Sequence, residues 1–140
     1  MPLTDDRLSI GSIIFEFVTD THPPKDKYYI IIGFTNDKIA LGTVFVNSVI
    51  NPNLFRTQYL RDLHIPLLQS EYPFLKYDSF IDCSNIQERP YANVRECING
   101  INNKYGYIGS VYLLKMDEIL KTLDNAHTIP VNIKRKFGLR

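Results

Sequence analysis

A nearly uninterrupted apolar run at residues 28–34, followed after a short polar link by a second apolar segment at 39–48, leaves few folds open to this chain. Such a run, rich in β-branched and aromatic residues, is typical of a central strand covered on both faces. The link at 35–38 is too short for a crossover connection, so the two segments predict an antiparallel hairpin. Residues 12–18 predict an earlier strand, separated from the hairpin by a polar, proline-containing loop.

The middle of the chain predicts further short strands. Residues 61–67 alternate polar and apolar side chains and predict a half-exposed strand, and 79–84 predict another. Residues 85–104 are polar and ambiguous, while 105–114 favour a last strand. Strands spaced by about ten residues, with turn signals between them, are typical of a small barrel or sandwich.

The end of the chain predicts helices. Acidic residues in a first turn and an apolar stripe favour a helix at 117–126. Thr128 as N-cap and Pro130 in the first turn predict a second helix. Gly138 stands where a glycine commonly ends a helix. The expected fold is therefore mainly β, of the α+β class, with C-terminal helices.

Composition excludes several other classes of protein. With 44% hydrophobic and 22% charged residues in a chain of 140, disorder, collagen and coiled coil are excluded, and we expect a single domain. That domain spans residues 1–140, with a barrel core at 10–85 and a helical tail at 116–138. No apolar run approaches the ~20 residues of a membrane span. The first residues lack the features of a secretory signal, so we expect a cytoplasmic protein.

Charge and cysteine content narrow the chemistry. Sixteen basic and fifteen acidic residues give a net charge of +1, which excludes a uniformly basic nucleic-acid binder. Cations gather near the C-terminus, where they either complement a helix dipole or contact phosphates or an acidic partner. The chain contains no CxxC pair, which excludes a zinc site made of cysteines, and we expect no metal and no cofactor. Cys83 and Cys97 are expected to be free, buried thiols.

Four segments, in this order and spacing, resemble the PemK/MazF-like toxins of bacterial toxin–antitoxin pairs. They are residues 11–14, 27–32, 46–48 and 79–84, so the resemblance covers about residues 10–85. It implies a small SH3-like antiparallel β-barrel that forms a homodimer and binds a cognate antitoxin protein. It also implies a metal-independent endoribonuclease that cleaves single-stranded RNA with the ribose 2′-hydroxyl as nucleophile. Such cleavage needs a proton acceptor, a proton donor and groups that stabilise the charge on phosphorus.

The resemblance carries over to particular positions. Lys27 and Tyr28 stand where the family commonly has an Arg-Pro pair, and Asn47 and Ser48 stand where it has Thr-Ser. A lysine donates to phosphate as a point charge rather than as a bidentate fork. His22 lies near the place of a first-loop histidine found in some members.

Other positions depart further from the family. Some members have an arginine and an aspartate two residues apart on the later strand; the matching positions here are Asp82 and Ser84, so the arginine is missing. The expected catalytic residues are His22 as acid or base, Lys27 as a phosphate anchor, Ser48 as a hydrogen-bond donor, and Asp82. The expected RNA-binding residues are Lys25, Lys76, Tyr77, Asp78 and Ser79.

Structural interpretations stand beside these roles. A buried Asp82 needs a partner, for which Lys27, Lys76 or Arg56 is available, and a structural ion pair or a turn cap is the alternative to catalysis. His64, between two apolar neighbours, favours a surface position. The altered family positions motivate a second hypothesis, a catalytically inactive SH3-like module that binds a protein or a nucleic acid.

Overall fold

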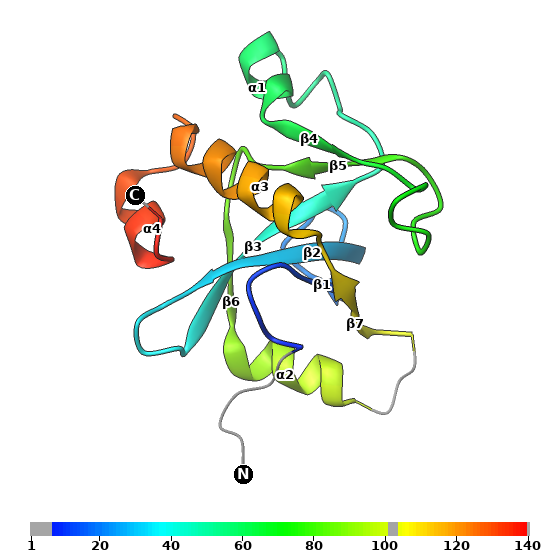
Figure 1. Ribbon diagram of the computed structural model, residues 1–140, viewed down its shortest axis with the longest axis vertical. Helices are drawn as coiled ribbons and strands as arrows, with labels where there is room; N and C mark the ends of the chain where they lie inside the picture. Colours follow the sequence, from blue (N-terminus) through cyan, green and yellow to red (C-terminus); the bar gives the residue numbers. More distant parts are fainter. Residues whose placement is uncertain (1–6, 101–103, 140) are drawn as a thin grey trace.

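The computed structural model describes residues 7–100 and 104–139, and within them the chain forms one curled antiparallel sheet of seven strands with four helices (Figure 1). The predicted class, mainly β with helices at the C-terminal end, is confirmed. The strands are β1 (Ser12–Val18), β2 (Lys25–Phe34), β3 (Ala40–Asn47), β4 (His64–Leu67), β5 (Ser79–Asp82), β6 (Gln87–Pro90) and β7 (Gly106–Ser110). The helices are α1 (Gln58–Asp62), α2 (Tyr91–Asn99), α3 (Leu113–Asn125) and α4 (Val131–Lys136).

The sheet has the order β4-β5-β3-β2-β1-β7, and β6 pairs with β3 beside β5. The predicted hairpin is the pair β2–β3. The C-terminal end of β3 pairs with β5, while its N-terminal half pairs with β6. Strands from beyond residue 85 therefore complete the sheet on both sides of the hairpin.

Part of the expected strand at 61–67 is helical. Helix α1 ends at Asp62, and its first turn is capped by the Thr57 hydroxyl, which accepts a hydrogen bond from the Leu60 amide at 3.1 Å. The strand begins only at His64. A hydroxyl at this position satisfies one of the free amides of the helix start, which favours the helix over a longer strand.

Two apolar cores explain why β2 is apolar without interruption. Ile30 and Ile32 belong to one core, which α3 and α4 cover, while Tyr29 and Ile31 belong to a second core on the opposite face. Helix α2 covers the second core through its apolar side chains (Figure 1). Because successive side chains of a strand point to opposite faces, burial of both faces requires apolar residues at every position.

The end of α4 packs directly against a glycine of β2. A Cβ atom placed on Gly33 would lie 2.2 Å from the carbonyl oxygen of Phe137, so no larger residue fits without movement of the backbone. Gly138 follows with φ of +80°, as expected of a glycine that ends a helix. The N-cap prediction was wrong: Pro130 occupies the N-cap position, and the Thr128 hydroxyl donates instead to the carbonyl of Ser84 at 2.6 Å.

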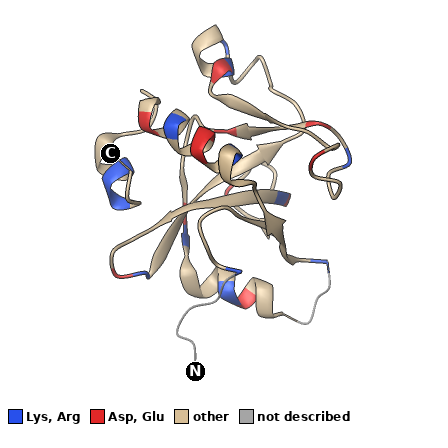
Figure 2. Ribbon diagram, in the orientation of Figure 1, with Lys and Arg blue, Asp and Glu red and all other residues tan. Residues whose placement is uncertain are grey.

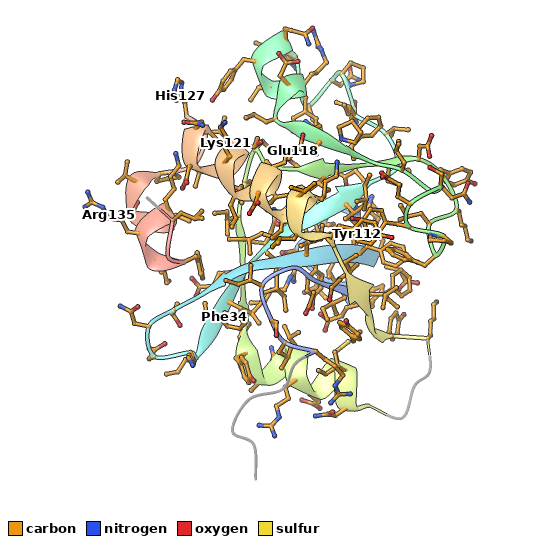
Figure 3. The ribbon with its side chains drawn as sticks, in the orientation of Figure 1. Phe34, Tyr112, Glu118, Lys121, His127 and Arg135 are labelled. Atoms are coloured by element: carbon orange, nitrogen blue, oxygen red, sulfur yellow. The ribbon has the colours of Figure 1, made fainter. Side chains whose placement is uncertain are left out.

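Positively charged residues mark helix α4 (Figure 2), and most of them make structural contacts. Lys134 is buried and donates to the carbonyl oxygen of Asp124 at 2.7 Å, and Lys136 pairs with Glu88 at 2.5 Å. Arg135 points away from the body of the molecule (Figure 3). Two of the three described cations of this segment therefore fasten the tail to the rest of the fold.

Candidate functional site

A groove of about 400 Å³ lies where the start of β2, the end of β3 and the start of β5 meet. We call it the strand-end groove. Antiparallel pairing brings these strand ends together, because β3 runs against both of its neighbours. The groove is lined by Phe15, Lys25, Asp26, Lys27, Tyr28, Val46, Ser48, Leu75, Lys76, Tyr77 and Ser79. Most of the residues singled out in the sequence therefore border one depression.

Aromatic rings form a continuous cluster in and beside the groove. The ring centroids of Phe15 and Tyr28 are 4.5 Å apart, and those of Tyr28 and Phe74 are 5.1 Å apart. Tyr77 is 65% exposed at the rim, between the exposed Lys76 and Asp78. A flat ring that faces solvent is a surface on which a nucleic-acid base stacks.

The charge balance of the groove is positive. Among the described residues that line it, Asp26 is the one carboxylate, and it is held by Lys104 at 2.9 Å and by the Tyr105 hydroxyl at 2.8 Å. These two hydrogen bonds lower the pKa of Asp26, so it remains ionised and matched by Lys104. Lys25 and Lys76 are exposed and add two further positive charges to the lining.

Two of the expected RNA-binding residues serve the local turn. The Asp78 carboxylate accepts a hydrogen bond from the amide of Gln69 at 2.9 Å, and Asp78 is not among the described residues that line the groove. Ser79 is buried, and its hydroxyl donates to the carbonyl of Tyr77 at 2.9 Å. Both contacts hold the segment that presents Lys76 to the groove.

The Lys27 side chain is buried and leaves β2 on the face opposite Tyr28. Its amine donates to the side-chain oxygen of Asn47 and lies 5.3 Å from the centroid of the Phe45 ring, which belongs to the second core. Burial, and after it the positive charge of Lys25, lower the pKa of Lys27 to about 8, while Asp82 acts in the opposite direction. Lys27 therefore borders the groove while its amine lies on the other face of the sheet.

Asp82 lies on the same face of the sheet as the Lys27 amine. Within the described residues it contacts Ser84 and His64 instead of the expected partners Lys27, Lys76 and Arg56. Its carboxylate accepts hydrogen bonds from the Ser84 amide at 2.9 Å and the Ser84 hydroxyl at 2.5 Å, and it faces the Nε2 atom of His64 at 3.6 Å. The contact with Ser84 is that of a turn cap, which was the structural alternative to a catalytic role. Of the expected partners, Lys27 acts on Asp82 only through its field.

His22 and His64 lie apart from the groove. His64 is buried rather than at the surface, because Phe55 packs on its ring at a centroid distance of 4.2 Å. Its Nδ1 atom lies 3.0 Å from the Leu60 carbonyl oxygen, and its Nε2 atom has no hydrogen-bond partner among the described residues. His22 is exposed in the loop between β1 and β2 and is not among the described residues that line the groove.

Arg89 on β6 is a site residue that the sequence analysis missed. Its guanidinium lies 4.5 Å from the centroid of the Tyr29 ring and 5.2 Å from that of Phe45, the ring that Lys27 also contacts. Its Nε atom donates to the Thr43 hydroxyl at 3.1 Å. The later core strand lacks an arginine, yet β6 brings one to the same face of the sheet. Gln87 and Arg89 stand two residues apart, as side chains on one face of a strand do, but the segment has no apolar alternation that would predict a strand.

Neither the scan against protein-family models nor the search of curated proteins gives a match.

Among residues 7–100 and 104–139, no group of three or more histidine, cysteine or acidic side chains is arranged to hold a metal ion. In the same part of the chain, every helix is too short or too polar to cross a membrane.

Proposed function

We propose that this protein is a metal-independent endoribonuclease that binds single-stranded RNA in the strand-end groove. The observation that carries the proposal is a groove with exposed lysines and an exposed tyrosine, bordered on β2 by Lys27, whose buried amine on the other face of the sheet has a pKa of about 8. Cationic grooves with aromatic rings are the common means of binding single strands without sequence readout. The resemblance to PemK/MazF-like toxins points to the same substrate.

Lys25 and Lys76 supply the binding step. Each neutralises one phosphate, and Tyr77 stacks on a base between them. The Ser48 hydroxyl, exposed at the end of β3, donates to a phosphate oxygen. The RNA strand continues from the groove around the start of β2 to the other face of the sheet, where it meets the amine of Lys27.

Lys27 supplies the proton acceptor. With a pKa of about 8, its amine is neutral in about one molecule in ten at pH 7. The neutral amine takes the proton of the ribose 2′-hydroxyl, the 2′-oxygen bonds to phosphorus, and the bond from phosphorus to the 5′-oxygen breaks. The ammonium of Lys25, whose charge acts on Lys27, returns a proton to the 5′-oxygen. The products are a 2′,3′-cyclic phosphate and a free 5′-hydroxyl.

The test is cleavage of an end-labelled, mixed-sequence RNA by purified protein in EDTA. We expect a cyclic phosphate on the upstream fragment, and a rate that increases with pH up to about 8 as Lys27 loses its proton. Lys27→Met should abolish cleavage but retain binding, while Lys76→Ala should weaken binding several-fold. Lys121→Ala is the matched control, since this lysine is exposed on α3 (Figure 3). Intact RNA at high protein concentration, together with no measurable binding, would refute the proposal.

A second candidate is the inactive binding module. It is favoured by the positions of His22 and Asp82, which stand outside the groove, so that two of the expected catalytic groups do not meet the RNA there. The same experiment separates the two candidates. Binding that depends on Lys76 without any cleavage supports the module.

The partners implied by the resemblance, an antitoxin protein and a second copy of the chain, belong to this proposal. What supports a protein partner is the start of α3, where Leu113 is 79% and Leu114 82% exposed. Adjacent exposed leucines are uncommon on a surface that faces only water. Light scattering of the purified protein, compared with a Leu113→Ser, Leu114→Ser variant, tests whether this surface joins two copies.

A further inference from the structure

We propose that Arg89 forms a binding site for a phosphate group, and that the carboxylate of Asp20 occupies this site in the absence of ligand. The nature of the ligand, a phosphate of single-stranded RNA, rests on the proposed function. The site itself is built from residues that lie outside the strand-end groove.

The guanidinium of Arg89 is fixed before any ligand arrives. Its side chain is 11% exposed, because it lies against the rings of Tyr29 and Phe45, and the Thr43 hydroxyl holds its Nε atom. Stacking and one hydrogen bond leave the outer edge of the guanidinium for an anion. Within the described part of the chain, its Nη1 atom has no hydrogen-bond partner.

Asp20 occupies that edge in a loose manner. Its two carboxylate oxygens both contact the same atom, Nη2 of Arg89, at 3.2 and 3.3 Å. This differs from the paired contacts through two nitrogens that make arginine–carboxylate bonds strong. The Asp20 side chain is 43% exposed and comes from the loop between β1 and β2. A phosphodiester, whose two non-bridging oxygens can each accept from a different nitrogen, is the better ligand for the free donors.

The cavity beside Arg89 limits the size of the anion that fits there. A cavity of about 270 Å³ adjoins the guanidinium, which is below the usual size of a pocket for a whole nucleotide and suits a phosphate group. Two carboxylates also line it, and both are engaged: Glu16 accepts a hydrogen bond from Tyr29 at 2.6 Å, and Glu88 pairs with Lys136. Lys27 adds a second cation beside the Phe45 ring.

The experiment compares Asp20→Asn with Asp117→Asn, which makes the same change of charge at an exposed position on α3. The probes are a labelled single-stranded RNA of ten nucleotides, followed by fluorescence anisotropy, and inorganic phosphate, followed by the NMR signal of the Arg89 Nε–H group. Exposed ion pairs have small energies, so we expect Asp20→Asn to tighten RNA binding about two- to fivefold. Asp117→Asn should change it by less than that.

The Arg89→Lys exchange completes the test. Added to Asp20→Asn, it should remove the gain in affinity, and phosphate should shift the Arg89 signal at lower concentration in Asp20→Asn than in the unaltered protein. Equal effects of the two aspartate exchanges, or a gain that survives Arg89→Lys, would overturn the proposal. RNA binding that needs Lys76 but is indifferent to Asp20 refutes this inference and leaves the proposed function standing. A phosphate shift at Arg89 without any RNA binding supports the anion site at Arg89 and refutes the proposed function.

Discussion

Lys27→Met should make the fold more stable at pH 7 while removing the amine on which the proposed chemistry depends. Methionine has a similar length and no charge, so it fills the same buried space beside Phe45. The decrease in the pKa of Lys27 from 10.5 to about 8 corresponds to a destabilisation of the native protein by about 3 kcal/mol at pH 7. Loss of the hydrogen bond to Asn47 offsets about 1–1.5 kcal/mol of the gain. We therefore expect a net stabilisation of about 1–2 kcal/mol.

The effect has a pH dependence with a defined sign. Because the pKa of Lys27 is lower in the folded protein, the unfolded chain binds more protons between about pH 8 and 10.5. The stability contribution of Lys27 therefore rises with pH across this window. At pH 9.5, the destabilisation caused by burial of Lys27 should be roughly 1.4 kcal/mol, which is less than half of its value at pH 7. The stabilisation gained by Lys27→Met should decrease by the difference between the values at pH 7 and pH 9.5.

Urea unfolding at pH 7 and pH 9.5 measures both effects. The midpoint should increase in Lys27→Met at pH 7 with an unchanged slope, and the difference from the unaltered protein should shrink at pH 9.5. Lys25→Met is the control, since this neighbour is exposed and its exchange should alter stability by less than about 0.5 kcal/mol. A lower midpoint for Lys27→Met at pH 7, or a difference that is the same at both pH values, would show that the buried amine is not under strain.

Two glycine substitutions and the reactivity of the cysteine thiols test the packing. Gly33→Ala should destabilise the fold by about 3 kcal/mol in thermal unfolding, because its Cβ would lie 2.2 Å from the Phe137 carbonyl, whereas Gly109→Ala, with no atom within 4 Å, should change stability by less than about 1 kcal/mol. Burial raises the pKa of Cys83 strongly and that of Cys97 to about 11, so both thiols should react slowly with a disulfide reagent at pH 8 and react fully once urea unfolds the chain. Rapid reaction of Cys83 in the native protein would contradict the buried position.

The hairpin could be predicted because burial of both faces leaves a strong mark on the sequence. Residues 28–34 are apolar at every position, and both alternating sets are indeed buried in separate cores. The C-terminal glycine signal at Gly138 worked for a similar reason, since a left-handed residue at a helix end favours one residue type. Strand β6 and helix α2 left no such mark. Gln87–Pro90 is a polar strand with half of its side chains exposed, so its apolar alternation is absent.

The meeting of the strand ends could also be predicted, but the faces could not. Antiparallel order alone brings Lys27, Ser48 and Lys76 to one end of the sheet. The direction of each side chain depends on register, and a difference of one residue sends Lys27 and Tyr28 to opposite faces. His64 was misplaced because its cover, Phe55, comes from a loop that no periodic pattern describes.

The Lys27–Asn47 pair offers a final distinction between a bond that stabilises the fold and one kept for chemistry. Asn47→Val alone should destabilise the protein by about 1–3 kcal/mol, because the Lys27 amine loses its acceptor while remaining buried. Combined with Lys27→Met, the same exchange should cost little, since apolar replacement of both partners leaves no polar group unsatisfied. The double variant should therefore be at least as stable as the unaltered protein, with a coupling of 1 kcal/mol or more between the two sites.

Urea midpoints of the four proteins in this cycle, measured at pH 7, give the coupling directly. A stable double variant that binds RNA but does not cleave it would show that the Lys27–Asn47 pair is kept for function although it lowers the stability of the fold. Additive losses at the two positions would instead show that the hydrogen bond is an ordinary element of the fold.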